Sequence, residues 1–207
     1  MTASSPETPE PSELPATGKK RLFYALWPDE AVRRRLVAVQ RAYRQIGRPV
    51  PGARIHLTVL FLGNADPERA AEAGAAAAAS TAPFRFELDT LGYFAKSRVV
   101  WAGASFCPDP LRRLHRALCR ELRRRRVTVR RRGLAPHLTL FRKARPVRGV
   151  VDEPPVWAAD RLTLVSSELN ADGPVYTVEA AWPFGRPPEW PPKWASKWGG
   201  HPGSDME

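Results

Sequence analysis

The sequence of 207 residues has little cysteine and no long apolar run. Its two cysteines, Cys107 and Cys119, do not have the spacing of metal ligands or of a redox pair, so we expect reduced thiols in a cytoplasmic protein. No apolar stretch reaches the ~18 residues that a membrane-spanning helix needs, and the N-terminus lacks the basic and then apolar pattern of a signal peptide. These absences predict a cytoplasmic protein without a membrane partner, and we expect a monomer.

Acidic residues are outnumbered by basic ones. The chain has 33 lysines and arginines but 21 aspartates and glutamates, which gives a formal net charge of +12 and a pI of about 10.6. Such a surplus favours a polyanionic partner, because lysine and arginine gain affinity when phosphates release their counterions. Charge alone does not separate RNA from DNA or from an acidic lipid surface. Basic residues that only maintain solubility are the alternative.

Histidine is also scarce, with four residues in the chain. They do not join cysteines or acidic residues in a cluster with metal-ligand spacing, so we expect neither a bound metal nor a cofactor. His115 flanks the leucine face of a predicted helix and His201 lies near the C-terminus, and we assign neither to a site. The other two, His56 and His137, begin similar segments.

The repeated segment is HLTVLF from His56 and HLTLF from His137. Each copy is rich in strand-forming residues and places a threonine, Thr58 or Thr139, two positions after the histidine. Residues i and i+2 of a strand point to the same face, so each copy directs an imidazole and a hydroxyl into one space. A single His-x-Thr in a strand carries little meaning. Two copies predict a site in which two imidazoles and two hydroxyls surround a small anion.

This set of groups suits phosphodiester cleavage. The reaction needs a base that takes a proton from water, an acid that protonates the departing sugar oxygen, and donors for the non-bridging oxygens. Histidine titrates near neutral pH, so one imidazole can be neutral while the other is charged. Threonine hydroxyls can donate to phosphate oxygens. No metal ion is required.

The periodicity of apolar residues predicts an α+β fold, because strands outnumber helices and the connections suit antiparallel neighbours. Residues 1–19 contain few bulky apolar residues, which predicts a disordered tail there. We expect one domain over 20–184, followed by a Pro-, Trp- and Gly-rich tail over 185–207. The expected helices are 29–46, 66–80 and 110–125. The expected strands are 21–27, 54–62, 84–88, 98–102, 137–142, 161–166 and 175–180.

Several segments in this order resemble the RNA 2′,3′-cyclic phosphodiesterases, also called 2′-5′ RNA ligases, of the two-histidine phosphoesterase class. They are RLFYAL at 21–26, RIHLTVLFLG at 54–63, PHLTLFRK at 136–143, SEL at 167–169 with the following Gly173 and Tyr176, and WPF at 182–184. The resemblance implies a bilobal fold, in which two pseudo-symmetric lobes with antiparallel sheets line a central cleft and the helices lie outside. It also implies hydrolysis of RNA 2′,3′-cyclic phosphate ends to 2′-phosphomonoesters.

The resemblance further implies a role for each motif residue. His56 is expected to be the proton donor and His137 the proton acceptor, while Thr58 and Thr139 bind the phosphate. Arg142 matches a family arginine that neutralises substrate charge. Its offset of five from His137 is odd, so in an ideal strand Arg142 points to the opposite face. Either a bulge redirects it or it acts from the rim of the cleft.

Arginines at 123–126 and 130–132 precede the second motif and predict a lip for an RNA backbone. Three other functions use the same features. One is ligation of RNA ends to 5′-hydroxyls, and a second is hydrolysis of small cyclic nucleotides. The third is RNA binding without catalysis, which the paired imidazoles disfavour because binding alone needs cations and aromatic rings.

Overall fold

A computed structural model of the chain describes residues 18–129, 133–170 and 173–185. The predicted tails, 1–19 and 185–207, lie almost wholly outside these ranges, and Arg130 to Arg132 lie outside them too. The domain boundaries therefore stay a prediction. None of the helices in the described part of the chain is long and apolar enough to cross a membrane.

Strands outnumber helices among the described residues, as the sequence predicts. The helices are α1 (Glu30–Ala42), α2 (Pro67–Ala79) and α3 (Asp109–Arg124), with a short 3-10 helix η1 (Gly52–Arg54). The strands are β1 (Lys20–Leu26), β2 (Arg48–Pro49), β3 (Leu57–Ala65), β4 (Phe84–Glu87), β5 (Thr90–Phe94), β6 (Val99–Gly103), β7 (Leu138–Arg142), β8 (Gly149–Val150), β9 (Val156–Ala159), β10 (Arg161–Asn170) and β11 (Gly173–Pro183).

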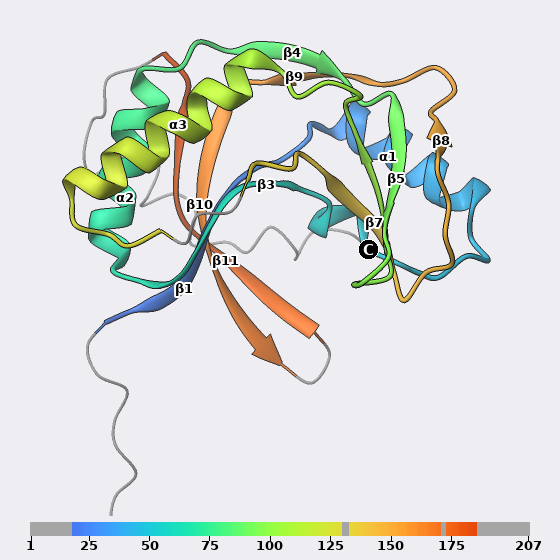
Figure 1. Cartoon of the computed structure of the whole chain (residues 1–207), viewed down its shortest axis with the longest axis horizontal. Coiled ribbons are helices and arrows are strands. Elements are labelled where there is room, and N and C mark those ends of the chain that lie inside the picture. The colour runs from blue at the N-terminus through green and yellow to red at the C-terminus, as the bar shows by residue number, and fades with distance from the viewer. Residues whose placement is uncertain (1–17, 130–132, 171–172, 186–207) are drawn as a thin grey trace, which may run out of the picture.

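The main sheet has nine strands, eight of them in the order β11-β10-β1-β3-β7-β6-β5-β8, and β2 pairs with β7 (Figure 1). Strands β4 and β9 form a second, two-stranded sheet. Every strand pair in the described ranges is antiparallel, which confirms the α+β class. The two halves of the main sheet meet only at β3 and β7, where Leu57 pairs with Leu138. Pseudo-symmetry between two lobes stays a prediction, since both halves belong to one sheet.

Helices α2 and α3 cover one face of the half-sheet formed by β11, β10, β1 and β3. Helix α2 contacts β1, β10, β11 and α3, and α3 contacts β3. The side chains of β1 alternate accordingly: Tyr24 is fully buried in the main core, whereas Phe23 belongs to a small separate cluster on the other face. A Cβ at Gly74 of α2 would lie 2.5 Å from the Trp182 ring, so only glycine permits this close approach. Helices α2 and α3 leave the opposite face of this half-sheet uncovered, so a functional site can form there.

The structure differs from the sequence prediction in its short strands and in one helix end. Strands β2, β5, β8 and β9 were not predicted. In β5 the obstacle is Gly92, which weakens the strand pattern but leaves room for the Trp101 ring 2.0 Å from where a Cβ would lie. Helix α1 ends at Ala42 rather than at Ile46, and the Ile46 carbonyl accepts a hydrogen bond from the amide of Arg145.

Candidate active site

The two repeated segments lie side by side where the halves of the sheet join. His56 and His137 each occupy the position just before a strand, β3 and β7 respectively, and the next residues of both strands pair with each other. The predicted strands therefore begin one to three residues too early. Both imidazoles and both threonines, Thr58 and Thr139, line the same pocket, as the repeat predicts.

A bulge follows the threonine in both strands. Against β1, residues Thr58 and Leu60 face successive residues of the partner, which leaves Val59 as an extra residue. Against β6, Thr139 and Phe141 face successive residues in the same way, and Leu140 is extra. A bulge places one more residue on a strand without advancing its partner, so the faces that follow are reversed.

The bulge in β7 explains the position of Arg142. Leu140 and Phe141 are consecutive and both fully buried, so Arg142 points back to the face of Thr139 and lines the pocket. The odd offset from His137 is therefore compatible with a place in the site. In β3 the matching position holds Phe61, whose ring is 41% exposed. Phe61 does not line the pocket, so at this position β7 contributes a cation to the site and β3 contributes no side chain.

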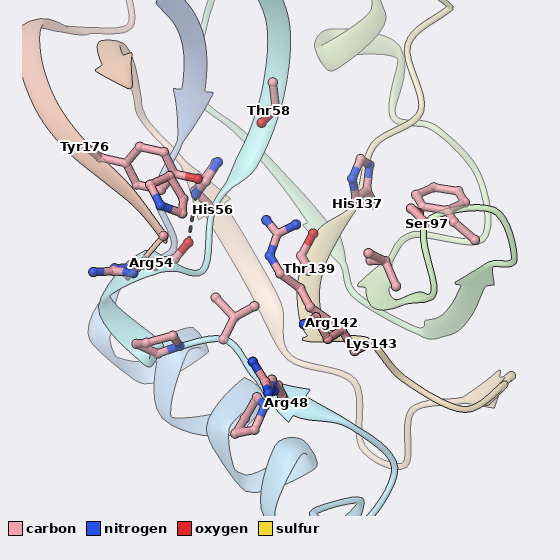
Figure 2. Close-up of a pocket in the computed structure, with 17 residues that line it drawn as sticks. Arg48, Arg54, His56, Thr58, Ser97, His137, Thr139, Arg142, Lys143 and Tyr176 are labelled. Atoms are coloured by element: carbon pink, nitrogen blue, oxygen red, sulfur yellow. Dashed lines mark hydrogen bonds between the residues drawn. The ribbon is translucent and has the colours of Figure 1, made fainter. Parts of the chain in front are cut away.

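The pocket has a volume of about 480 Å³, within the range of about 300–1,000 Å³ that is usual for small-molecule sites. Figure 2 shows His56 and His137 on opposite sides of it, with Thr58 toward one end and Arg48 toward the other. Five residues predicted from the sequence line the pocket. Residues that were not predicted also line it, among them Arg48, Arg54, Phe94, Lys143 and Tyr176.

Backbone carbonyls hold both imidazoles in the same way. His56 Nδ1 lies 2.8 Å from the carbonyl oxygen of Arg54, and His137 Nδ1 lies 2.7 Å from that of Ala135. A carbonyl oxygen can only accept, so each Nδ1 carries a hydrogen and donates it. In each ring, Nε2 is then the nitrogen that gains or loses a proton. The same local geometry, from residue i to i−2, therefore prepares both histidines for proton transfer.

Aromatic side chains surround His56 more closely than His137. The His56 ring stacks on Phe23 and Trp27, with centroid distances of 5.2 and 4.8 Å, and meets Tyr176 edge-on at 5.3 Å. Desolvation in this cluster lowers the pKa of His56 from 6.5 to about 4. The hydrogen bond to Arg54 opposes this shift, while the nearby charges of His137 and Arg142 add to it.

His137 has fewer aromatic neighbours and meets them edge-on. Its ring centroid lies 4.9 Å from that of Phe94, at an interplanar angle of 84°, and 6.4 Å from that of Trp101. No aromatic ring among the described residues stacks face to face on it. The two histidines thus share a backbone anchor but differ in their aromatic surroundings.

The pocket is cationic. Arg48, Arg54, Arg142 and Lys143 all line it, and none of its described lining residues is acidic. This charge favours an anionic ligand. The described residues of the chain contain no group of three or more histidine, cysteine or acidic side chains placed to hold a metal ion.

The arginines at the end of α3, Arg123 to Arg126, do not line the pocket. Arg125 is paired with the buried Glu121 at 2.8 Å. Arg125 also contacts Glu72 of α2, so it links the two outer helices. Helix α3 carries the described part of this arginine run to the outer side of the sheet (Figure 1), so the contact of these arginines with an RNA backbone stays a prediction.

Comparison with known proteins identifies the family of the chain. The sequence model of the 2′-5′ RNA ligase superfamily matches residues 27–171. The chain belongs to this superfamily. Within the 2′-5′ RNA ligase superfamily, it is 37% identical over 175 residues to the RNA 2′,3′-cyclic phosphodiesterase of Thermus thermophilus, a match that covers 76% of this chain and 87% of the relative. The family predicted from the motifs is confirmed.

Two Escherichia coli comparisons extend the match. The chain is 29% identical over 170 residues to the RNA 2′,3′-cyclic phosphodiesterase of that organism, which covers 79% of this chain and 96% of the relative. The apo crystal structure of LigT superposes with a TM-score of 0.70 at 28% identity, over 82% of this chain and 100% of LigT. The fold of the 2′-5′ RNA ligase superfamily therefore extends over most of the chain.

Proposed function

We propose that this chain hydrolyses 2′,3′-cyclic phosphate ends of RNA to 2′-phosphomonoesters, without a metal ion, through His56 and His137. One observation carries the proposal: both imidazoles have Nδ1 bonded to a backbone carbonyl and line the same cationic pocket. The names of the relatives from Thermus thermophilus and Escherichia coli support the same reaction.

In the proposed reaction, water attacks phosphorus opposite the 3′ oxygen. His137 Nε2 takes a proton from the water as its oxygen bonds to phosphorus, and His56 Nε2 gives a proton to the 3′ oxygen as the P–O3′ bond breaks. The product keeps its phosphate on the 2′ oxygen. The imidazoles end with exchanged protonation states, and proton exchange with solvent restores them.

The environment of His56 supports its role as donor. The departing 3′ oxygen belongs to the nucleoside, and the surface of Phe23, Trp27 and Tyr176 around His56 suits a sugar and base. With a pKa of about 4, His56 is neutral in the ligand-free pocket at neutral pH. A bound phosphate adds a negative charge beside the ring and offsets the charge of Arg142, so it raises this pKa, and the ring takes up a proton from solvent.

The remaining motif residues have binding roles in this proposal. Thr58 and Thr139 follow the histidines on the same faces and donate to the non-bridging oxygens. Arg142, redirected by the bulge, neutralises the charge that develops on these oxygens in the transition state. Their action needs no resident cofactor.

The test is to incubate the protein in EDTA with a short RNA that ends in a 2′,3′-cyclic phosphate and to follow the product by ³¹P NMR. We expect a 2′-phosphomonoester at undiminished rate. Substitution of His56 or His137 by Gln should lower the rate by about 10²–10⁴-fold. His115→Gln, which changes a histidine outside the pocket, is the matched control and should leave the rate unchanged. A 3′-phosphate product or a requirement for a divalent ion contradicts the proposal, and joined RNA would indicate ligation instead.

A further inference from the structure

The cations of the pocket are not distributed evenly around its centre. In Figure 2, Arg48 and Lys143 lie toward the end of the pocket away from Thr58, Arg142 lies between these two and the histidines, and Arg54 lies apart from them on the side of His56. Within the described ranges, no acidic side chain forms an ion pair with any of the four. Some arginines outside the pocket do form ion pairs, as Arg35 does with Glu153 at 3.0 Å.

Arg48 and Arg142 face each other directly across strands β2 and β7, where they are Cα partners. Like charges in directly opposite positions of an antiparallel pair destabilise the sheet. A negatively charged group between them removes this repulsion and turns it into attraction. The register of β2, a strand of two residues, therefore favours an anion site between the two arginines.

The backbone of Lys143 is held in the left-handed region, with φ of 51°. A residue other than glycine adopts this conformation at a cost of about 1–2 kcal/mol. The residues that follow enforce it: the amide of Ala144 donates to the carbonyl of Arg98, and that of Arg145 donates to the carbonyl of Ile46. A lysine at this position keeps its charge on the pocket rim, where glycine would fit the backbone better.

The charge exceeds what the reacting group needs. A 2′,3′-cyclic phosphate carries one negative charge, which the imidazolium and Arg142 already balance. We propose that Arg48 and Lys143 form a second phosphate-binding site, which holds the phosphate on the 5′ oxygen of the terminal nucleotide. This inference rests on the proposed function and deepens it, because it makes an end with a 5′ phosphate or phosphodiester the preferred substrate.

Three substrates separate the sources of such a phosphate. Cytidine 2′,3′-cyclic phosphate has no 5′ phosphate, its 5′-phosphorylated form has a terminal one, and the dinucleotide CpC 2′,3′-cyclic phosphate has a phosphodiester. For the wild-type chain we expect kcat/KM to be roughly tenfold higher for the last two, since several exposed charge contacts act together. The salt dependence of log kcat/KM should be steeper by about 0.7 per added phosphate contact.

Substitution identifies the residues. Arg48→Gln and Lys143→Gly should each lower this advantage by roughly threefold, and the double variant should abolish it. Glycine suits the φ of Lys143, so Lys143→Gly removes the charge without strain in the backbone. Arg85→Gln is the matched control, because Arg85 is exposed on β4 and does not line the pocket. It should keep the full advantage.

A binding measurement gives the same comparison without turnover. Calorimetry should show that cytidine 2′,5′-bisphosphate binds roughly tenfold more tightly than cytidine 2′-phosphate, and that Arg48→Gln lowers this difference to roughly threefold. Equal affinities overturn the second site. An advantage confined to the dinucleotide and kept by both variants also overturns it, because the contact would then be to a nucleoside. Tighter bisphosphate binding without hydrolysis of any substrate would keep the second site and refute the proposed reaction.

Discussion

The side-chain amide of Gln40 on α1 donates a 2.8 Å hydrogen bond to the carbonyl oxygen of Leu140, the extra residue of the bulge in β7. The same nitrogen donates to the carbonyl of Val50, whose amide in turn donates to Leu140. Gln40 is buried, and it ties helix α1 to the bulge that directs Arg142 into the pocket. It is therefore a positioning residue.

Replacement of Gln40 by Met keeps the size of the side chain but removes these hydrogen bonds. We expect the free energy of unfolding to fall by about 1–3 kcal/mol, because the carbonyls of Val50 and Leu140 lose a partner. Gln40→Met should also lower kcat/KM, because the bulge then holds Arg142 less firmly. In a chain that already carries Arg142→Gln, Gln40→Met should cause no further fall in kcat/KM, since both changes act through the same guanidinium. Chemical denaturation and a double-mutant cycle measure the two effects. Gln45→Met, at an exposed position just beyond α1, is the control, and additive losses in the cycle would refute the link to Arg142.

His56 should titrate far below the usual range in the ligand-free protein. Its stacking on Phe23 and Trp27 excludes water, which lowers its pKa to about 4. NMR titration of labelled histidines should find this value, and Trp27→Ala should raise the pKa because it admits water. Binding of cytidine 2′-phosphate should also raise it, so that the protein takes up a proton between about pH 4 and 6.5. A His56 that titrates near 6.5 without ligand would contradict the desolvation argument.

The same pKa makes folding stability depend on pH. An unfolded chain protonates His56 near pH 6.5, whereas the folded chain does so only near pH 4. The unfolded state therefore binds more protons between these values, and the free energy of unfolding should fall as pH is lowered from 6.5 to 4. His56→Gln should flatten this part of the curve. Denaturation of both proteins at a series of pH values measures it, and identical slopes would show that His56 does not contribute.

The threonines can be tested by loss of the hydroxyl at nearly constant shape. Thr58→Val and Thr139→Val should each lower kcat/KM by roughly tenfold, whereas the corresponding serine variants should retain most activity. The paired valine and serine results separate hydrogen bonding from packing. Thr177→Val, which changes an exposed threonine outside the pocket, should have no effect. Equal activity of the valine and serine variants would remove the threonines from phosphate binding.

Arg142 and the arginines of α3 should respond differently. Arg142→Gln should lower kcat/KM on cyclic phosphates, and Arg142→Lys should recover part of it, because lysine keeps the charge but not the planar fork. Arg123→Gln should leave kcat/KM on RNA unchanged, since Arg123 lies outside the pocket. Steady-state kinetics at fixed salt compare the three. A loss of kcat/KM in Arg123→Gln as large as that in Arg142→Gln would instead support the prediction that the arginines of α3 contact the RNA backbone.

Much of the fold was predictable because local patterns and tertiary structure agree. Asp66 accepts hydrogen bonds from the amides of Glu68 and Arg69 and caps α2 at the start of the expected helix 66–80. Disagreement arises where distant partners override a local pattern. Gly92 weakens the sequence pattern of β5, but the Trp101 ring occupies the space that a side chain at this position would fill. Helix α1 stops four residues before the predicted end, and the Ile46 carbonyl accepts a hydrogen bond from the amide of the distant Arg145.

The candidate site was likewise predictable only where local sequence patterns determine it. The sequence predicts that His56, Thr58, His137 and Thr139 meet, because each pair depends only on strand alternation. Neither the bulge that redirects Arg142 nor the buried bond from Gln40 has a local signature. Arg48 and Tyr176 reach the pocket from separate elements, β2 and β11, so only the fold brings them to the histidines.

The central claim is that His56 and His137 perform separate proton transfers on one phosphate. It is tested most directly by the rates of wild type, His56→Gln and His137→Gln on a nitrophenyl phosphodiester, whose leaving group needs no proton, compared with a 2′,3′-cyclic phosphate, whose leaving group does. We expect His56→Gln to recover at least about tenfold in relative rate on the nitrophenyl ester, while His137→Gln stays impaired because water must still lose a proton. Recovery of His137→Gln alone would reverse the two roles, and near wild-type rates for both variants on both substrates would contradict the claim itself.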